Sequence, residues 1–131
     1  MAKETKKEDK VKDENLMAAL AHAGIVLGGT WVALIIWLLQ KDKSDYVDFQ
    51  AKQALLYQIG IYVLGVILGI SLGIFHIIFG LLTIGIGFLF GLLLWPLAGL
   101  LGLTAIIYGL YGAYETLNGK EFKYYWLGDK L

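Results

Sequence analysis

The chain has 131 residues, 58% of them hydrophobic, and its 11 lysines balance 11 acidic residues. Average soluble domains carry about 25% charged residues, whereas this sequence carries 17%. The sequence contains no cysteine and no arginine, which excludes disulfide frameworks and thiolate sites and argues against a nucleic-acid partner.

The charged residues are unevenly distributed along the chain. Residues 16–40 and 53–114 contain no Asp, Glu, Lys or Arg, and the second stretch is 62 residues long. A soluble protein could not cover a core with such a stretch, whereas helices solvated by lipid need no polar surface. The sequence therefore predicts an all-α, polytopic protein of the cell membrane, with about four transmembrane helices in a glycine-rich bundle.

The first 40 residues are expected to form a tail and a first transmembrane helix. Residues 1–15 hold five lysines and five acidic residues, a composition typical of a mobile or frayed helical tail in water. Residues 16–40 would form a helix of about 37 Å, enough to cross a hydrocarbon core of about 30 Å. The pair Gly28-Gly29 lies in its middle, so the alternative is a re-entrant hairpin of two short helices.

Residues 41–52 form an amphipathic loop with three lysines and three aspartates. Ser44 or Asp45 can cap a new helix. We expect an entry turn that runs without interruption into the second transmembrane helix.

The long uncharged stretch has to be divided without charges as guides. Three crossings of about 20 residues fit a bilayer better than two helices of about 30. The available breaks are Ser71-Leu72-Gly73 and Trp95-Pro96, while a rival break at Gly85-Ile86-Gly87 would leave two long helices. The preferred division places transmembrane helices 2, 3 and 4 at residues 50–72, 74–94 and 97–115.

The carboxyl-terminal residues 116–131 follow a helix stop signal at Asn118-Gly119. Their lysines alternate with aromatic residues, a composition suited to the membrane interface. We expect an interfacial anchor. Its aromatic residues are Phe122, Tyr124, Tyr125 and Trp126.

The lysines also indicate a topology. With four spans, eight lysines of the two tails face one side and three of the loop face the other, so both termini are expected in the cytoplasm. In the hairpin alternative all 11 lysines lie on one side, which satisfies the same rule better.

Small residues recur at helical spacing and predict close helix packing, because lipid does not drive apolar helices together. Such a face can pack the helices of one chain or be left for self-association or a partner. The predicted packing residues are Gly65, Gly69, Gly73, Ala98, Gly102, Ala105, Gly109 and Ala113.

The uncharged stretches contain no carboxylate or lysine, which argues against an ion-coupled transporter. Two histidines without a neighbouring carboxylate or thiol do not predict a metal site. We therefore expect no catalytic residue and no cofactor. The candidate polar or partner contacts are His22, Asp48, Gln50, Lys52, Gln53, Gln58, His76 and Asn118.

Two segments carry a resemblance to a known family: IIWLLQKD at residues 35–42 and YVDFQAKQAL at residues 46–55. They resemble a widespread family of small bacterial and archaeal membrane proteins of unknown function, itself similar to the chloroplast inner-envelope import subunit Tic-twenty. Residues 19–22 and 118–124 fit the same pattern. The resemblance implies four membrane helices with cytoplasmic termini and, in the plastid branch, a place in a protein-conducting translocon.

The sequence departs from that pattern in two places. The region 53–114 is longer than is usual for the prokaryotic relatives, and Tyr125 stands where they often have proline. In plant relatives the segment matching residues 16–40 forms two helices, which again favours the hairpin alternative.

The first hypothesis for function is a non-enzymatic scaffold or assembly partner within the bilayer, with a second copy or another membrane protein as its partner. The second is a component of a translocon or other conduit. A conduit needs a polar lining. The residues that could supply one are Gln53, Gln58, Ser71, His76, Thr83 and Thr104.

Overall fold

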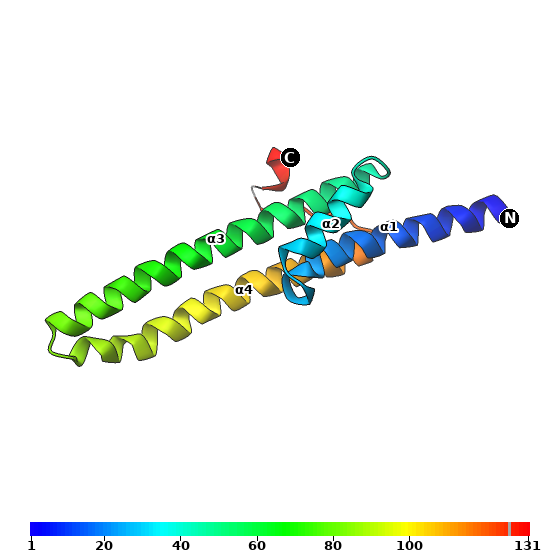
Figure 1. The fold of residues 1–131 in the computed structure, drawn as a ribbon. Coiled ribbons are helices and arrows are strands. Elements are labelled where there is room, and N and C mark those ends of the chain that lie inside the picture. Colours follow the sequence, from blue (N-terminus) through cyan, green and yellow to red (C-terminus); the bar gives the residue numbers. More distant parts are fainter. Residues whose placement is uncertain (126) are drawn as a thin grey trace. The chain divides into compact units, whose positions relative to one another are not determined.

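The computed structural model describes residues 1–125 and 127–131, so Trp126 of the predicted anchor lies outside the described residues. The described residues form helices and connecting turns without a strand, which confirms the all-α prediction. Figure 1 shows the helices in chain order. They are α1 (Ala2–Leu27), α2 (Thr30–Gln40), α3 (Asp45–Leu82), the 3-10 helix η1 (Ile86–Phe90), α4 (Gly91–Leu117) and the 3-10 helix η2 (Gly128–Lys130).

The chain forms two compact units. One comprises Met1–Ile59 and Ile106–Leu131, and the other comprises Gly60–Ala105. All 11 lysines and all 11 acidic residues belong to the first, which we call the charged unit. The second, the uncharged unit, contains the carboxyl-terminal part of α3, the turn, η1 and the first half of α4.

In the charged unit, residues 16–40 do not form one helix. The chain breaks at Gly28-Gly29, and α1 and α2 pack against each other as a hairpin. Gly29 has φ 69° and ψ −159°, a conformation that glycine adopts without steric cost. The prediction of a single transmembrane helix over this segment is therefore wrong, because the backbone reverses at the glycine pair.

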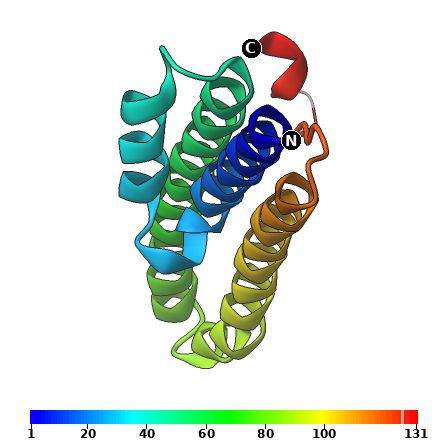
Figure 2. The same cartoon turned by 90° about the vertical axis from the view of Figure 1, so that its right-hand side faces the viewer.

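Alanine contacts bring the helices of the charged unit close together. Ala21 of α1, Ala33 of α2 and Ala51 of α3 are fully buried in one cluster with Ala54 and Leu55. Small side chains allow helix backbones to approach. Figure 2 shows α1 beside α2 and between the parts of α3 and α4 that belong to this unit.

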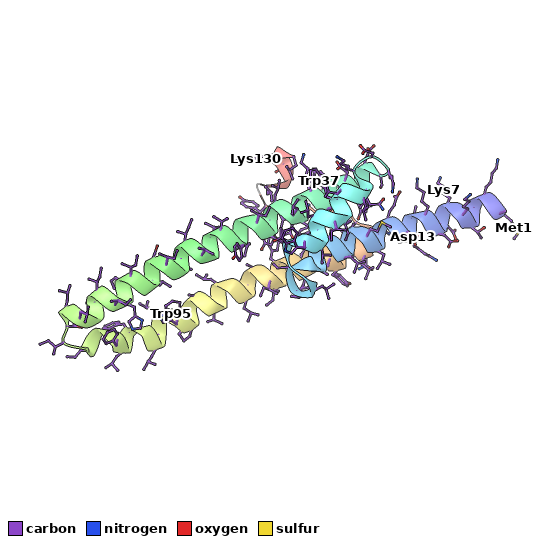
Figure 3. All side chains as sticks on the ribbon, viewed as in Figure 1. Met1, Lys7, Asp13, Trp37, Trp95 and Lys130 are labelled. Carbon is purple, nitrogen blue, oxygen red and sulfur yellow. The ribbon has the colours of Figure 1, made fainter. Side chains whose placement is uncertain are left out.

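The first half of α1 has no such partners. Its residues 2–13 are helical and exposed, and Figure 3 shows Lys7 and Asp13 on a stretch of helix that no other element covers. The segment predicted as a charged, frayed tail is thus a solvated helix.

Helix α3 begins at the position expected for an entry turn and continues much further than expected. The Ser44 hydroxyl accepts a hydrogen bond of 3.3 Å from the Val47 amide, and the carboxylates of Asp45 and Asp48 suit the first turn. The helix then runs for 38 residues through Ser71-Leu72-Gly73. The predicted break there is wrong, since neither serine nor glycine removes a backbone hydrogen bond.

The turn after α3 lies at the rival break. Gly85 has φ 88°, and the Thr83 hydroxyl donates to the Phe79 carbonyl and accepts from the Gly87 amide, both at 2.6 Å. Pro96, in contrast, lies inside α4. A proline removes one backbone hydrogen bond of a helix, but a helix in apolar surroundings can continue past it. The segments predicted as helices 74–94 and 97–115 therefore contain the end of α3, the turn, η1 and the long helix α4.

Two of the described helical segments are long and apolar enough to cross a membrane. They are Asp45–Leu82 and Ile86–Leu117, which contain 18-residue stretches with mean hydropathies of 2.4 and 2.1, respectively. Helix α2 has 11 residues, about 16 Å, which is half of a hydrocarbon core. The structure thus has two candidate spans where the sequence predicted four.

Candidate functional site

The most elaborate polar site lies in the core of the charged unit, where side chains of α1 and α3 hold an extended segment that follows α4. His22, Gln50 and Gln53 are fully buried there, and so is Tyr124 at 2% exposure. Buried polar groups are stable when each finds a partner. We call this site the tail slot and define it by His22, Gln50, Gln53, Tyr57 and Gly112.

The two glutamines bind the main chain of the segment. Gln53 Nε2 donates to the Phe122 carbonyl at 2.9 Å, and Gln53 Oε1 accepts from the Tyr124 amide at 2.8 Å. Gln50 Nε2 donates to the same Phe122 carbonyl at 3.0 Å. One peptide segment therefore receives three hydrogen bonds from two side chains one helical turn apart on α3.

His22 links the glutamines to the tail. Its Nε2 lies 3.0 Å from Gln50 Oε1, which can only accept, so Nε2 carries the proton. The neutral ring then accepts at Nδ1, and the Tyr124 hydroxyl donates to it at 2.9 Å. Burial lowers the pKa of His22 to about 4, and the hydrogen bond to Gln50 opposes this shift weakly.

Aromatic rings fill the rest of the tail slot. Tyr124 stacks on Tyr57 with ring centres 3.9 Å apart and planes 9° apart. Phe122 meets His22 edge-on at 5.4 Å and lies over Gly112, where an added Cβ would come within 2.8 Å of the ring. Burial raises the pKa of the Tyr124 hydroxyl, which keeps it a neutral donor.

The other predicted polar residues of the charged unit have separate roles. Gln58 Nε2 donates to the Ala21 carbonyl at 2.9 Å and ties α3 to α1. Asp48 accepts from the Trp37 indole at 2.8 Å and ties α3 to α2. Asn118 donates to the Tyr114 carbonyl at 2.7 Å at the end of α4, and Lys52 is half-buried on α3.

In the uncharged unit the glycine face of α3 is open. A Cβ added at Gly65, Gly69 or Gly73 would meet nothing within 4 Å, and the same holds for Gly102 of α4. These residues therefore do not pack α3 against α4, contrary to one of the two expectations. A groove of about 510 Å³ lies between the two helices instead. Small residues on its lining are Gly65, Gly69, Ala98, Gly99, Gly102 and Ala105.

Glycines of the charged unit behave differently. A Cβ at Gly109 would lie 3.2 Å from Ile25 of α1, so this part of α4 does pack closely, and Ala113 is half-buried on the same helix.

His76 lies in the uncharged unit, where its Nδ1 accepts a hydrogen bond of 3.0 Å from the indole of Trp95. Figure 3 shows Trp95 on the part of α4 nearer the turn. The Thr83 hydroxyl donates to the Phe79 carbonyl in the last turn of α3, and the Thr104 hydroxyl donates to the Leu100 carbonyl within α4. His76 is thus bonded across to α4 and the two threonines are bonded within four residues, and within this unit the described residues show no shared polar lining.

The sequence analysis identified three residues of the tail slot but did not identify the segment of the chain that the slot holds. His22, Gln50 and Gln53 were candidates, whereas Phe122 and Tyr124 were assigned to the membrane interface. That assignment is wrong for both, because they are buried in the charged unit. Their spacing of two, with exposed Lys123 and Tyr125 between and after them, is the signal for an extended segment with one buried face.

Comparison of the sequence with known proteins places this chain in a family. A family model described as the magnetosome magnetite crystal formation protein family (MamF/MmsF) matches residues 13–129. The chain belongs to this family. The match includes every residue of the tail slot and both candidate spans.

A second comparison agrees with a membrane location for this MamF/MmsF family member. The chain is 29% identical to a UPF0132 membrane protein of Methanocaldococcus jannaschii over 117 residues, which cover 89% of this chain and 84% of that protein. No solved structure is significantly similar to the chain. The prediction of a small prokaryotic membrane family is confirmed, while the link to Tic-twenty stays a prediction.

Proposed function

We propose that this member of the MamF/MmsF family is a non-enzymatic scaffold that assembles with other helices within the bilayer. The observation that supports the proposal is the open groove of the uncharged unit, with small residues on both helices. Helices in lipid associate through such faces, because close backbone approach supplies the packing that the hydrophobic effect does not. The partner is a second copy or another membrane protein with a similar face.

The proposed topology places the charged unit on one face of the membrane. Two crossings, by α3 and by η1 with α4, return the chain to the side from which it started. All 11 lysines then lie on one side, and the positive-inside rule assigns that side to the cytoplasm. The hairpin alternative for residues 16–40 is part of this topology.

The printed description of the family refers to magnetite crystal formation in magnetosomes. Among the residues that the structure describes, no group of three or more His, Cys, Asp or Glu could hold a metal ion. The proposed role is therefore assembly within a membrane. By such assembly a protein can contribute to crystal formation without binding a metal ion itself.

The groove is tested by Gly69→Leu. A side chain at this position meets open space in the isolated chain, so the variant should fold normally but lose association with other copies in lipid vesicles. Energy transfer between differently labelled copies measures this loss. Gly60→Leu is the matched control, since it also meets open space but does not line the groove. Equal energy transfer in all three proteins would contradict the proposal.

The topology is tested by single cysteines at Ser44 and at Asp129. Both should react with a membrane-impermeant reagent from the same side of an oriented vesicle. Reaction from opposite sides would contradict this topology, because it requires an odd number of membrane spans between residues 44 and 129, as in the four-span prediction.

The alternative function is a component of a conduit. Gln53 and Gln58 make hydrogen bonds within the charged unit, and the hydroxyls of Thr83 and Thr104 donate to carbonyls four residues earlier in the chain. The geometry therefore favours the scaffold. Ion flux through vesicles that contain the purified chain alone would favour the conduit.

A further inference from the structure

The turn between α3 and α4 satisfies its own backbone amides. Every amide from residue 83 to residue 88 donates a hydrogen bond within this segment or to the last residues of α3. All of these bonds end on carbonyls except that of the Gly87 amide, which donates to the Thr83 hydroxyl at 2.6 Å. The segment is also tightly closed, since a Cβ added at Gly87 would lie 2.6 Å from the Phe79 carbonyl oxygen. The amides of this turn therefore need no water.

The glycine turn between α1 and α2 is built differently. Its Gly28 amide donates to the Gly24 carbonyl at 3.2 Å. Among the hydrogen bonds of the described residues, none is donated by the amides of residues 29–31. Unbonded amides are costly in hydrocarbon, whereas water satisfies them. Of these two turns, the one after α3 is the one whose amides suit a place in lipid.

The side chains around the turn after α3 are apolar and face outwards. Thr83 is the one polar residue in the segment 77–94, and its hydroxyl is used within the turn. Large apolar side chains that gather on an exposed surface mark a contact with lipid or with protein. Those at this turn are Leu81, Leu82, Ile84 and Ile86, with exposed fractions of 70%, 77%, 94% and 66%.

The length of the helices limits how far the turn can reach. Residues 60–82 of α3 belong to the uncharged unit and extend about 34 Å. The hydrocarbon core of a bilayer is about 30 Å thick, and the bilayer with its headgroups is about 40–45 Å thick. If the charged unit stays outside the core on one side, the turn comes to the far boundary of the hydrocarbon and stops short of the water beyond it.

We propose that the turn, residues 81–88, lies among the acyl chains of the far leaflet and is not exposed to the water beyond them. Helices α3 and α4 then form a hairpin inserted from one side of the membrane. Acyl chains offer no hydrogen bonds, and the amides of the turn require none from outside. The inference rests on the proposed topology and refines it, since all contacts with water-soluble partners would lie on the side of the charged unit.

The test uses the full-length chain, which has no cysteine, in vesicles of phosphatidylcholine and phosphatidylglycerol. Ile84→Cys and Lys43→Cys each place one thiol at an exposed position of a turn. A membrane-impermeant maleimide is supplied on both sides of the membrane, so that the orientation of the protein does not matter. The thiol of Ile84→Cys should react at least about tenfold more slowly than that of Lys43→Cys, because the reactive thiolate is disfavoured in hydrocarbon. Equal reaction rates would overturn the proposal.

A nitroxide attached to the same two cysteines distinguishes a lipid cover from a protein cover. At Ile84→Cys, collisions with oxygen should exceed collisions with a water-soluble nickel chelate, because oxygen concentrates in acyl chains. The order should be reversed at Lys43→Cys. Rare collisions with both reagents at Ile84→Cys would mean that protein covers the turn, and would overturn the proposal.

The topology test gives an independent result. If cysteines at Ser44 and Asp129 react from one side while Ile84→Cys also reacts rapidly, the turn reaches the far water, so this inference fails and the proposed topology stands. Reaction of the cysteines at Ser44 and Asp129 from opposite sides would overturn the topology and this inference with it.

Discussion

The two units of this protein differ in where they place their polar and apolar side chains. The charged unit buries polar side chains and bonds them to partners within the chain, as in the contacts of His22, Gln50 and Gln53 with the tail, and among the described residues only the Gln58 Oε1 atom stays buried without a hydrogen bond. The uncharged unit leaves large apolar side chains on its outside and small residues over an open groove. The first unit finds its polar contacts within one chain, whereas the second unit would, under the proposed function, be completed by lipid or by another helix.

The largest effect is expected from Tyr124→Ala. The variant removes a buried ring stacked on Tyr57 and the donor for His22, and such truncations cost about 3–5 kcal/mol. Unfolding in detergent followed by near-ultraviolet circular dichroism measures the change. Tyr62→Ala in the uncharged unit, where the side chain is 72% exposed, should stay within about 0.5 kcal/mol. Similar losses in both variants would remove the distinction between the units.

The next effect is a loss of stability of the charged unit at low pH. The pKa of His22 is about 4 in the fold against a usual 6.5, so below pH 6.5 the unfolded chain binds a proton that the folded chain does not. Stability is therefore complete above about pH 6.5 and falls by about 3 kcal/mol by pH 4.

The measurement is the midpoint of unfolding in detergent at pH 7, 6, 5 and 4. The variant His22→Gln lacks the titrating group and should show a smaller dependence on pH than the native chain. Identical pH profiles for the two proteins would show that His22 is not the group responsible.

A pair of equal substitutions sharpens the comparison further. Gly112→Ala places a Cβ about 3 Å from His22 and Phe122, and overpacking of this kind costs about 1–3 kcal/mol. Gly69→Ala meets nothing within 4 Å and replaces glycine by a better helix former, so it should stabilise α3 by up to about 1 kcal/mol. Thermal unfolding of both variants measures the change in stability, which should be a loss for Gly112→Ala and a gain for Gly69→Ala. A change in the same direction for both variants would be inconsistent with the structure.

The smallest effect is expected at the end of α4. Asn118→Ala removes an exposed hydrogen bond to the Tyr114 carbonyl, worth about 0.5 kcal/mol. Limited proteolysis between α4 and the tail should become slightly faster, while the tail slot retains its ligand. Full release of the tail in this variant would mean that the connection, and not the slot, holds the segment.

Part of the candidate site could be predicted from residue type alone. Gln53, Gln58 and His22 are polar residues beside apolar stretches, and such residues need partners. Their partners could not be predicted, because the tail's aromatic residues suit an interface and a core equally well. Only the alternation of buried Phe122 and Tyr124 with exposed Lys123 and Tyr125 separates the two environments.

The division of the long uncharged stretch shows a second limit. Ser71-Leu72-Gly73, Gly85-Ile86-Gly87 and Trp95-Pro96 all contain residues that can end a helix. The chain turns at Gly85, where Thr83 closes the turn through two hydrogen bonds. It continues through the other two, since an apolar helix satisfies its backbone groups internally.

The sequence by itself determined that the protein is helical, which residues carry charge and which 62 consecutive residues carry none. These properties follow from composition and hold for any arrangement of the helices. The tertiary structure alone decided that residues 16–40 fold back, that the tail enters a polar slot and that the glycine faces of the uncharged unit stay open. Each of these depends on contacts between residues far apart in the chain, and the free energy of such contacts is not encoded in any local pattern.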